Sequence, residues 1–473
     1  MMMRALRFTL LAAPVLLLAL AAGCTTDTVF VDRPPFNPPP DSAAGFLGYF
    51  DVAQKTTTCG NCHVSRAASW QGTAHADAYN TLANNPGAQP FCFTCHTVSE
   101  NGNLTPGPAG WNVVQSDAYH DVQCESCHGP GFQHVQAPDA SAPRASIKGD
   151  TTSTAACGSC HSGAHNPFIE DWSQSRHNIM NPFPRSREEC ISCHTAQGAL
   201  KAFGVNSRYL EWQAPLGQME TITCAVCHDP HGSDNPAQLR FALTPASQET
   251  NLCIKCHHKR SEPDTGVVEF FRGPHSPEGP LVLGEVVGWI PPGTDPEIGR
   301  IRGSHGADRN QRLCAQCHVE KFSVTDAQTG NFIVTSTGHT FRAIPCVDAN
   351  GQPTPDQSCT QLTERRFVAC TASGCHADET AARSAYTVAT NRIDPLIATL
   401  DSLLQRVPPG ELDPTTGIFT VAKGASFNKA LAEKTGSSVH NPFLIEQLLT
   451  ASISAVNAEY GPFTIRINLD LQL

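Results

Sequence analysis

The sequence contains the pentapeptide Cys-x-x-Cys-His eight times between residues 59 and 318. Two thiols at this spacing, followed directly by an imidazole, form the attachment signature of a c-type haem. The thiols bond to the two vinyl groups of the porphyrin, and the histidine binds the iron from one face. In chain order, motifs 1 to 8 are Cys59–His63, Cys92–His96, Cys124–His128, Cys157–His161, Cys190–His194, Cys224–His228, Cys253–His257 and Cys314–His318.

A ninth site, motif 9, is expected at Cys370-Thr-Ala-Ser-Gly-Cys375-His376, where four residues separate the thiols instead of two. The Cys-His end is intact, so His376 can still turn onto an iron while the longer loop bulges. A disulfide between Cys370 and Cys375 is the alternative. Cys346 or Cys359 could also replace Cys370 as the first thiol, but the local pair is the simpler interpretation.

The sequence therefore predicts eight haem c groups from the regular motifs and a ninth from the variant. The expected attachment thiols are Cys59, Cys62, Cys92, Cys95, Cys124, Cys127, Cys157, Cys160, Cys190, Cys193, Cys224, Cys227, Cys253, Cys256, Cys314, Cys317, Cys370 and Cys375. The expected proximal iron ligands are His63, His96, His128, His161, His194, His228, His257, His318 and His376. Structural zinc is a poor alternative, because a zinc site does not require a histidine after every second cysteine.

The second face of each iron needs another ligand, and the chain holds 20 histidines in total. After the nine proximal residues, the expected distal ligands are His75, His134, His177, His231, His258, His275, His305, His339 and His440. His120 and His165 are set aside, because neither has a counterpart in the internal repeat described next. Only Met180 and Met219 lie outside the N-terminal leader, so almost every haem is expected to have two histidine ligands and a low reduction potential.

The first six motifs begin 32 to 34 residues apart and contain a larger repeat. Trp70-x4-His75 follows motif 1 and Trp172-x4-His177 follows motif 4, with the two tryptophans 102 residues apart. His134 and His231 each follow the third motif of a triplet. Residues 55–135 and 153–232 therefore resemble a tandem duplication of a three-haem unit, and each unit is expected to stack on its neighbour.

Composition argues against an ordinary side-chain core, because the chain has 36 glycines, 36 prolines and only 7% aromatic residues. The expected fold is mostly α with extensive irregular coil, wrapped around a stacked haem array at residues 46–376. A helical cap is expected at 377–473, with helices at 378–405 and 441–459 and with His440 directed into the array. Cys346 and Cys359 flank a polar loop and are expected to form a disulfide.

The N-terminus predicts export and a lipid anchor. Residues 1–23 combine basic residues with an apolar run, as in a signal peptide. Leu20-Ala21-Ala22-Gly23-Cys24 resembles a lipobox, so Cys24 is the expected lipidation site. Residues 24–45 are Pro-rich and are expected to form a tether. These features favour an outer-membrane lipoprotein on the periplasmic or cell-surface face.

These motifs resemble those of the multihaem c-type cytochromes of dissimilatory bacteria, of the doubled Cys-x-x-Cys-His type. The segments that carry the resemblance are Trp70–Ala76, Gln123–Gly131, Cys224–Gly232 and His440–Pro442. The adjacent His257-His258 is similar to the arrangement in small tetrahaem cytochromes, where the second histidine binds another haem. The resemblance implies closely packed haems that form a continuous conducting chain, and its relatives include filament-forming cytochromes.

Two functions are compatible with these features. The first is a carrier that moves electrons between other redox proteins, such as cytochromes, and a periplasmic or extracellular acceptor. The second is an oxidoreductase that reduces nitrite, hydroxylamine or a sulfur oxyanion at one haem with an open face. The ligand count favours the carrier, and assembly into a homo-polymer is a further option. The net charge of −11 disfavours nucleic acid as a partner.

The lipobox generates the first prediction. Replacement of Cys24 by Ala removes the thiol that would be acylated, so the variant should lose its lipid and leave the membrane fraction. Mass spectrometry and membrane fractionation measure both effects. A Cys24→Ala protein that remains acylated and membrane-bound would contradict the predicted anchor.

Overall fold

The computed structural model describes residues 36–149, 157–163, 167–205, 208–244, 247, 249–326 and 328–461. The predicted signal peptide, Cys24, most of the predicted tether and His165 lie outside these residues. The described residues from Pro38 onward belong to one compact unit.

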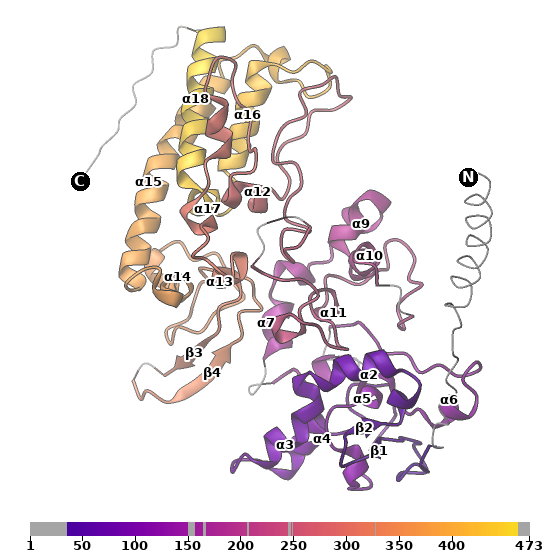
Figure 1. The fold of residues 1–473 in the computed structure, drawn as a ribbon. Coiled ribbons are helices and arrows are strands. Elements are labelled where there is room, and N and C mark those ends of the chain that lie inside the picture. Colours follow the sequence, from indigo (N-terminus) through magenta and orange to yellow (C-terminus); the bar gives the residue numbers. More distant parts are fainter. Residues whose placement is uncertain are drawn as a thin grey trace, which may run out of the picture. The chain divides into compact units, whose positions relative to one another are not determined.

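Helices dominate the regular structure, and little sheet accompanies them (Figure 1). The helices before residue 300 are α2 (Val64–Gln71), α3 (Ala78–Ala83), α4 (Phe93–His96), α5 (Cys124–His128), α6 (Phe132–Gln136), α7 (Phe168–Ser173), α8 (Pro182–Arg185), α9 (Glu188–His194), α10 (Ala196–Ala202), α11 (Cys224–Cys227) and α12 (Glu278–Leu283). Those after it are α13 (Cys314–His318), α14 (Val368–Thr371), α15 (Glu379–Leu404), α16 (Val421–Ala432), α17 (Ser437–His440) and α18 (Pro442–Tyr460). These elements confirm the prediction of a mainly helical chain with much coil.

The sheet consists of two small antiparallel pairs in the described part of the chain. Strand β1 (Tyr49–Asp51) pairs with β2 (Thr56–Thr57), with Tyr49 opposite Thr57. Strand β3 (Phe322–Thr325) pairs with β4 (Phe332–Ser336), with Phe322 opposite Ser336.

The haem-binding motifs form single helical turns rather than long helices. In motifs 1, 4, 6 and 7 the backbone N–H of the histidine donates to the carbonyl of the first cysteine, at 2.9 to 3.0 Å. One such turn spans the five residues of the motif, so both thiols and the imidazole are held on a short, defined piece of backbone.

Equivalent hydrogen bonds occur in the two segments that the sequence suggests are duplicated. The indole N–H of Trp70 donates to the carbonyl of Val122 at 3.0 Å, and that of Trp172 donates to Ile222 at 2.9 Å. The N–H of Val122 donates in turn to the carbonyl of His75, and the N–H of Ile222 to that of His177. Each tryptophan therefore joins the histidine near the first motif of a triplet to the segment just before the third.

The folded body begins earlier than the predicted tether boundary at residue 45. Asp41 is buried, its N–H donates to the hydroxyl of Tyr119, and its carboxylate accepts from the N–H of Gly110. Phe46 packs against the ring of Tyr119. Residues 41–46 are thus part of the folded body, because the aspartate closes a local turn and is itself held by two distant groups.

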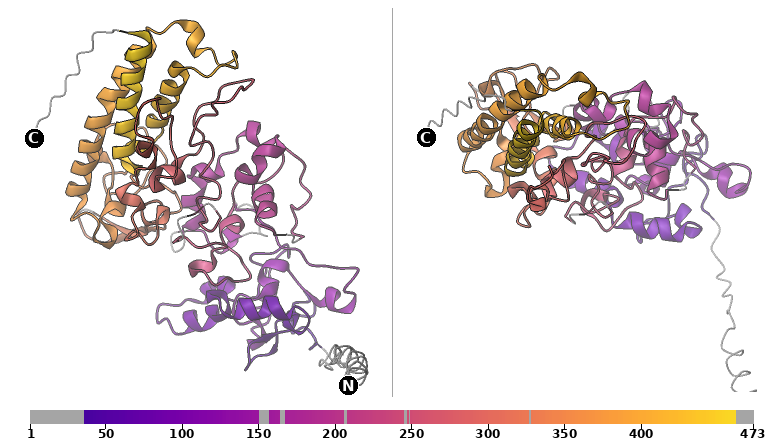
Figure 2. Two further views of the ribbon diagram at one scale, coloured as in Figure 1. Left: turned by 45° about the horizontal axis from the view of Figure 1, so that its top comes forward. Right: turned by 90° about the horizontal axis from the view of Figure 1, so that it is seen from above.

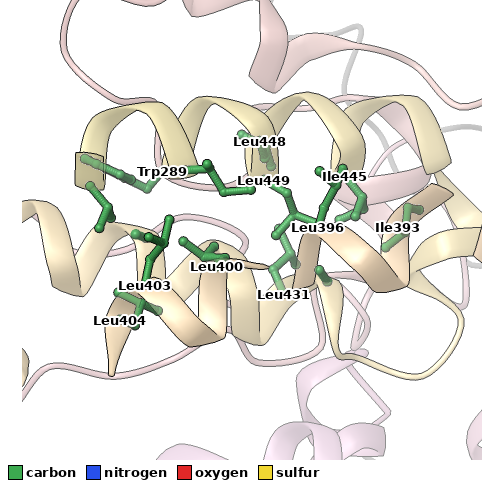
Figure 3. Close-up of a cluster of buried hydrophobic side chains, with 14 of the residues drawn as sticks. Trp289, Ile393, Leu396, Leu400, Leu403, Leu404, Leu431, Ile445, Leu448 and Leu449 are labelled. Carbon is green, nitrogen blue, oxygen red and sulfur yellow. The ribbon is translucent and has the colours of Figure 1, made fainter. Parts of the chain in front are cut away.

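The C-terminal helices have a conventional apolar core, which differs from the composition-based expectation. Both predicted helices are present: α15 begins after Asp378, whose side chain caps it, and α18 begins after the cap residue Asn441. The sequence-based prediction missed α16, which packs against both (Figures 1 and 2). Figure 3 shows the apolar side chains that fill the space between these helices.

A loop before the C-terminal helices completes this core. Trp289 packs against α16 at Gly424, where a Cβ would lie 2.1 Å from the indole, so a larger residue would collide. The side chain of Asn428 accepts from the N–H of Trp289 and donates to its carbonyl, both at 2.7 Å. Contacts therefore cross the boundary expected at residue 377. In the described residues, no helix has the length and apolar character needed to cross a membrane.

The core generates a stability prediction. Leu400 on α15 is fully buried, and its replacement by Ala should reduce the free energy of unfolding by about 2–5 kcal/mol. Val388 on the same helix is 59% exposed, so Val388→Ala should change it by less than about 0.5 kcal/mol. Thermal unfolding of the holoprotein, followed by far-UV circular dichroism, measures both. Equal effects of the two substitutions would contradict the proposed core.

Candidate haem-binding sites

Seven of the nine predicted proximal histidines face a second imidazole in the structure. The ring centres are 6.0 to 6.3 Å apart in all seven pairs. The pairs are His63 with His134, His75 with His161, His128 with His231, His177 with His257, His194 with His275, His228 with His339 and His318 with His440. Each pair joins one predicted proximal residue to one predicted distal residue.

This separation fits one iron between two imidazoles. A metal–imidazole nitrogen bond is about 2.0 Å and each nitrogen lies about 1.1 Å from its ring centre, so opposite ligands place their ring centres about 6.2 Å apart. The rings are therefore too far apart to stack directly on each other, and they leave the space that a metal between them requires. A haem c group at each motif would supply one-electron redox chemistry at this position.

Hydrogen bonds at the far ring nitrogen orient several of these histidines. The Nδ1 atoms of His96, His128, His228 and His318 lie 2.7 to 3.1 Å from backbone carbonyl oxygens. Among the distal candidates, His258, His305 and His339 have the same kind of partner at 2.6 to 3.2 Å. A carbonyl can only accept, so Nδ1 carries the proton and Nε2 keeps the lone pair that an iron needs.

Burial also favours the neutral imidazole. It lowers the pKa of His75, His177, His339 and His440 to about 4, and the neighbouring imidazole of the same pair contributes to each shift. A metal ligand must be unprotonated. These four distal candidates are therefore in the ligating form throughout the physiological pH range.

The structure does not place every candidate opposite a partner. His96 of motif 2 and His376 of motif 9 are not among the seven pairs, and neither are His258 and His305. His120 stacks on the ring of Tyr79 with ring centres 3.4 Å apart and lies beside Trp111. Its surroundings are those of a packed aromatic side chain, which agrees with setting it aside.

Two distal candidates that occupy equivalent sequence positions have different partners. His134 lies opposite His63 of its own triplet, whereas His231 lies opposite His128 of the preceding triplet. By contrast, His75 and His177 each face the histidine of the next motif after their own triplet, His161 and His257. Sequence correspondence therefore identifies equivalent positions but does not determine which iron each one reaches.

Thiols of different motifs meet in a regular order. Five pairs of thiols lie close enough for one partner to shift the pKa of the other: Cys59 with Cys124, Cys95 with Cys160, Cys157 with Cys224, Cys193 with Cys256, and Cys253 with Cys314. Burial raises the pKa of Cys127 and Cys317, with smaller contributions from Cys157 to the first and from Cys370 and Cys375 to the second, and Cys227 contributes to the raised pKa of Cys256. The pairs of neighbouring motifs 1 and 3, 2 and 4, and 3 and 4 thus recur three motifs later as 4 and 6, 5 and 7, and 6 and 7.

In motif 9, as in the regular motifs, a hydrogen bond joins the histidine to the first cysteine, although it closes a loop that is two residues longer. The N–H of His376 donates to the carbonyl of Cys370 at 3.2 Å. Gly374 has a φ of 71°, with open space where a Cβ would stand, so the extra residues bulge outward. Cys370 and Cys375 are free thiols, and the predicted disulfide between Cys346 and Cys359 is present. The structure therefore supports the local pair as the ninth attachment site.

Sequence reasoning did not identify the groups that form hydrogen bonds with the Nδ1 atoms of these histidines. Most are backbone carbonyls in irregular segments, such as Ala78 for His96 and Phe341 for His318. A carboxylate does the same for His257, because Oε2 of Glu278 lies 3.2 Å from its Nδ1. Burial alone would lower the pKa of His257, but the Glu278 hydrogen bond and charge outweigh it and raise that pKa.

Comparisons with known proteins agree with the predicted cofactor. Residues 214–262 match the family model "Doubled CXXCH motif", and residues 58–129 match "Cytochrome c554 and c-prime". The chain is 28% identical over 267 residues to the multiheme cytochrome MtrA of Shewanella baltica, across 52% of this chain and 71% of that protein. It is 27% identical over 229 residues to the C-type polyheme cytochrome OmcC of Geobacter sulfurreducens, across 40% and 29%.

A solved structure supports the fold. The undecaheme cytochrome from the S-layer of Carboxydothermus ferrireducens aligns with a TM-score of 0.51 and 16% identity, across 90% of this chain and 70% of that one. At this identity the similarity concerns the fold alone.

The geometry of motif 9 generates a prediction of haem content. Mass spectrometry of the intact holoprotein should show nine haem additions. The Cys375→Ala variant should show eight, because it lacks the thiol next to His376 that motif 9 needs to attach its haem. Cys346→Ser is the matched control, because it removes a disulfide cysteine without changing the haem count. Nine additions in Cys375→Ala would contradict the assignment.

Proposed function

We propose that this multihaem c-type cytochrome carries electrons along a chain of haems whose irons have histidine on both faces. The observation that carries the proposal is the set of seven imidazole pairs at 6.0 to 6.3 Å. An iron with two protein ligands has no free position for a substrate, so its haem exchanges electrons without binding a reactant.

The order of the haems follows from the thiol contacts. Each thiol marks an edge of its porphyrin, so thiols that meet indicate haem edges that are close. The contacts support a main path through motifs 1, 3, 4, 6, 7, 8 and 9, with motif 2 beside motif 4 and motif 5 beside motif 7. Motifs 1 and 9 would then be the two ends of the path.

The ligand type supports a low reduction potential. Methionine as the second ligand raises the potential of a c-type haem relative to histidine. The paired residues are all histidines, while Met219 accepts a hydrogen bond from Thr195 and Met180 is 54% exposed. We therefore expect donors and acceptors of low potential.

The cellular setting is inferred from the leader and the relatives. The predicted lipid at Cys24 would tether the protein to the outer membrane, and the C-terminal helices would cap the haem array and supply His440. The names of the similar proteins include an S-layer cytochrome. The partners we propose are other cytochromes and an extracellular or periplasmic electron acceptor, and assembly into a polymer is a further option.

A reductase acting on nitrite, hydroxylamine or a sulfur oxyanion is the second candidate. The observation that favours it is that His96 and His376 do not belong to the seven pairs, so the irons of motifs 2 and 9 could keep one open face. His258 and His305 favour the carrier, because both have Nδ1 bonded to a carbonyl and Nε2 available for a further iron.

Replacement of one distal histidine tests the carrier. In His134→Ala, the haem of motif 1 loses its second ligand and should become high-spin, while the wild-type protein and His120→Ala remain fully low-spin. Resonance Raman and EPR spectra measure the spin state, and assays with nitrite and hydroxylamine measure turnover. A high-spin haem with turnover in the wild-type protein would establish the reductase instead, and an unchanged His134→Ala spectrum would contradict the pairing.

A further inference from the structure

The proximal histidine His257 has a carboxylate as the hydrogen-bond partner of its Nδ1 atom, whereas several other proximal histidines have a backbone carbonyl there. Oε2 of Glu278 lies 3.2 Å from Nδ1 of His257 in motif 7. The corresponding nitrogens of His96, His128, His228 and His318 face carbonyl oxygens instead. The second iron ligand expected at motif 7, His177, is a fully neutral imidazole with its ring centre 6.3 Å away.

The backbone holds Glu278 in this position. Glu278 is the first residue of α12, and the N–H of the next residue, Gly279, donates to the carbonyl of His257 at 2.8 Å. A Cβ at Gly279 would lie 2.7 Å from that carbonyl oxygen and 2.9 Å from the side chain of Ile254. Only glycine permits α12 to approach motif 7 this closely, so the position of the carboxylate is a property of the fold.

A carboxylate changes the chemistry of the ligand it contacts. An imidazole that donates its Nδ1 proton to a carboxylate gains imidazolate character and becomes a stronger base at Nε2. A stronger donor with a nearby negative charge stabilises Fe³⁺ relative to Fe²⁺, which lowers the reduction potential. A neutral carbonyl partner has the same geometric effect but adds no charge.

We infer that Glu278 is a positioning residue that acts through His257. It lowers the reduction potential of the haem at motif 7 below that of haems whose proximal histidine has a backbone carbonyl at Nδ1. The inference rests on the proposed function and deepens it. Motif 7 is one of two branch points in the haem order, with motif 4, because its thiols lie near Cys193 of motif 5, Cys227 of motif 6 and Cys314 of motif 8. Electrons that pass between the repeated triplets and motifs 8 and 9 would therefore cross the haem that Glu278 controls.

A second carboxylate provides a comparison within the chain. Oδ1 of Asp229 lies 3.3 Å from Nδ1 of His231, which faces motif 3. Asp229 also forms an ion pair with Arg240 at 2.9 Å, with both side chains at most one fifth exposed. The guanidinium offsets the negative charge, so Asp229 should lower the potential of its haem less than Glu278 does.

The test is a spectroelectrochemical titration of the full holoprotein and of Glu278→Gln. One of the nine haems should move to a more positive midpoint potential, and that haem should also change its low-spin EPR signal, while the haem count stays at nine. Asp229→Asn should give a smaller shift. Glu285→Gln is the charge control, because Glu285 is exposed just beyond α12 and should leave every potential unchanged.

Two outcomes would overturn the role of Glu278, and a third would overturn the carrier function on which it rests. Unchanged potentials in a fully haem-loaded Glu278→Gln protein would overturn it. If that variant loses haem, Glu278→Asp retains a carboxylate at a greater distance and should give a shift in the same direction; haem loss in both variants would overturn the tuning role in favour of a structural one. High-spin haem with substrate turnover in the wild-type protein would refute the carrier function separately.

Discussion

The second ligand of each iron is the constraint on which the rest of this structure depends. A haem-binding motif supplies two thiols and one imidazole from five neighbouring residues, but the opposite imidazole must come from elsewhere in the chain. His339 reaches His228 and His440 reaches His318 in this way, with more than 100 residues between the partners. In the proposed carrier, an iron bound between two such partners would act as a long-range crosslink, and haem binding would be coupled to folding.

This constraint explains why the two parts of the chain are built differently. The repeated triplets have only small apolar clusters, such as the one around Phe46 and Tyr119, and depend on irregular coil that brings histidines together. The C-terminal helices surround a continuous leucine-rich core and present His440 from α17 at one end. Conventional packing thus fixes the position of one proposed ligand, and we expect haem binding to organise the remainder.

Much of the candidate site could be predicted from sequence because its chemistry is local. The spacing of thiols and histidine identifies a motif wherever it occurs, and Cys346 and Cys359 flank a loop short enough to close. The pairing of distal residues is not local: His134 and His231 occupy equivalent positions, each after its own triplet, yet both face motifs of the first triplet. Glu278 and the backbone carbonyls that contact the histidines were missed for the same reason. Helix α16 was missed because its small residues, such as Gly424, pack against Trp289, which lies in a distant part of the sequence.

The central claim is that one iron lies between the two imidazoles of each of the seven pairs. An experimental structure of the holoprotein, by crystallography or electron cryo-microscopy, tests it most directly. The account predicts that Nε2 atoms of both partners bind the same iron, for example those of His228 and His339. Partners bound to different irons, or a water molecule in place of the distal imidazole, would contradict it.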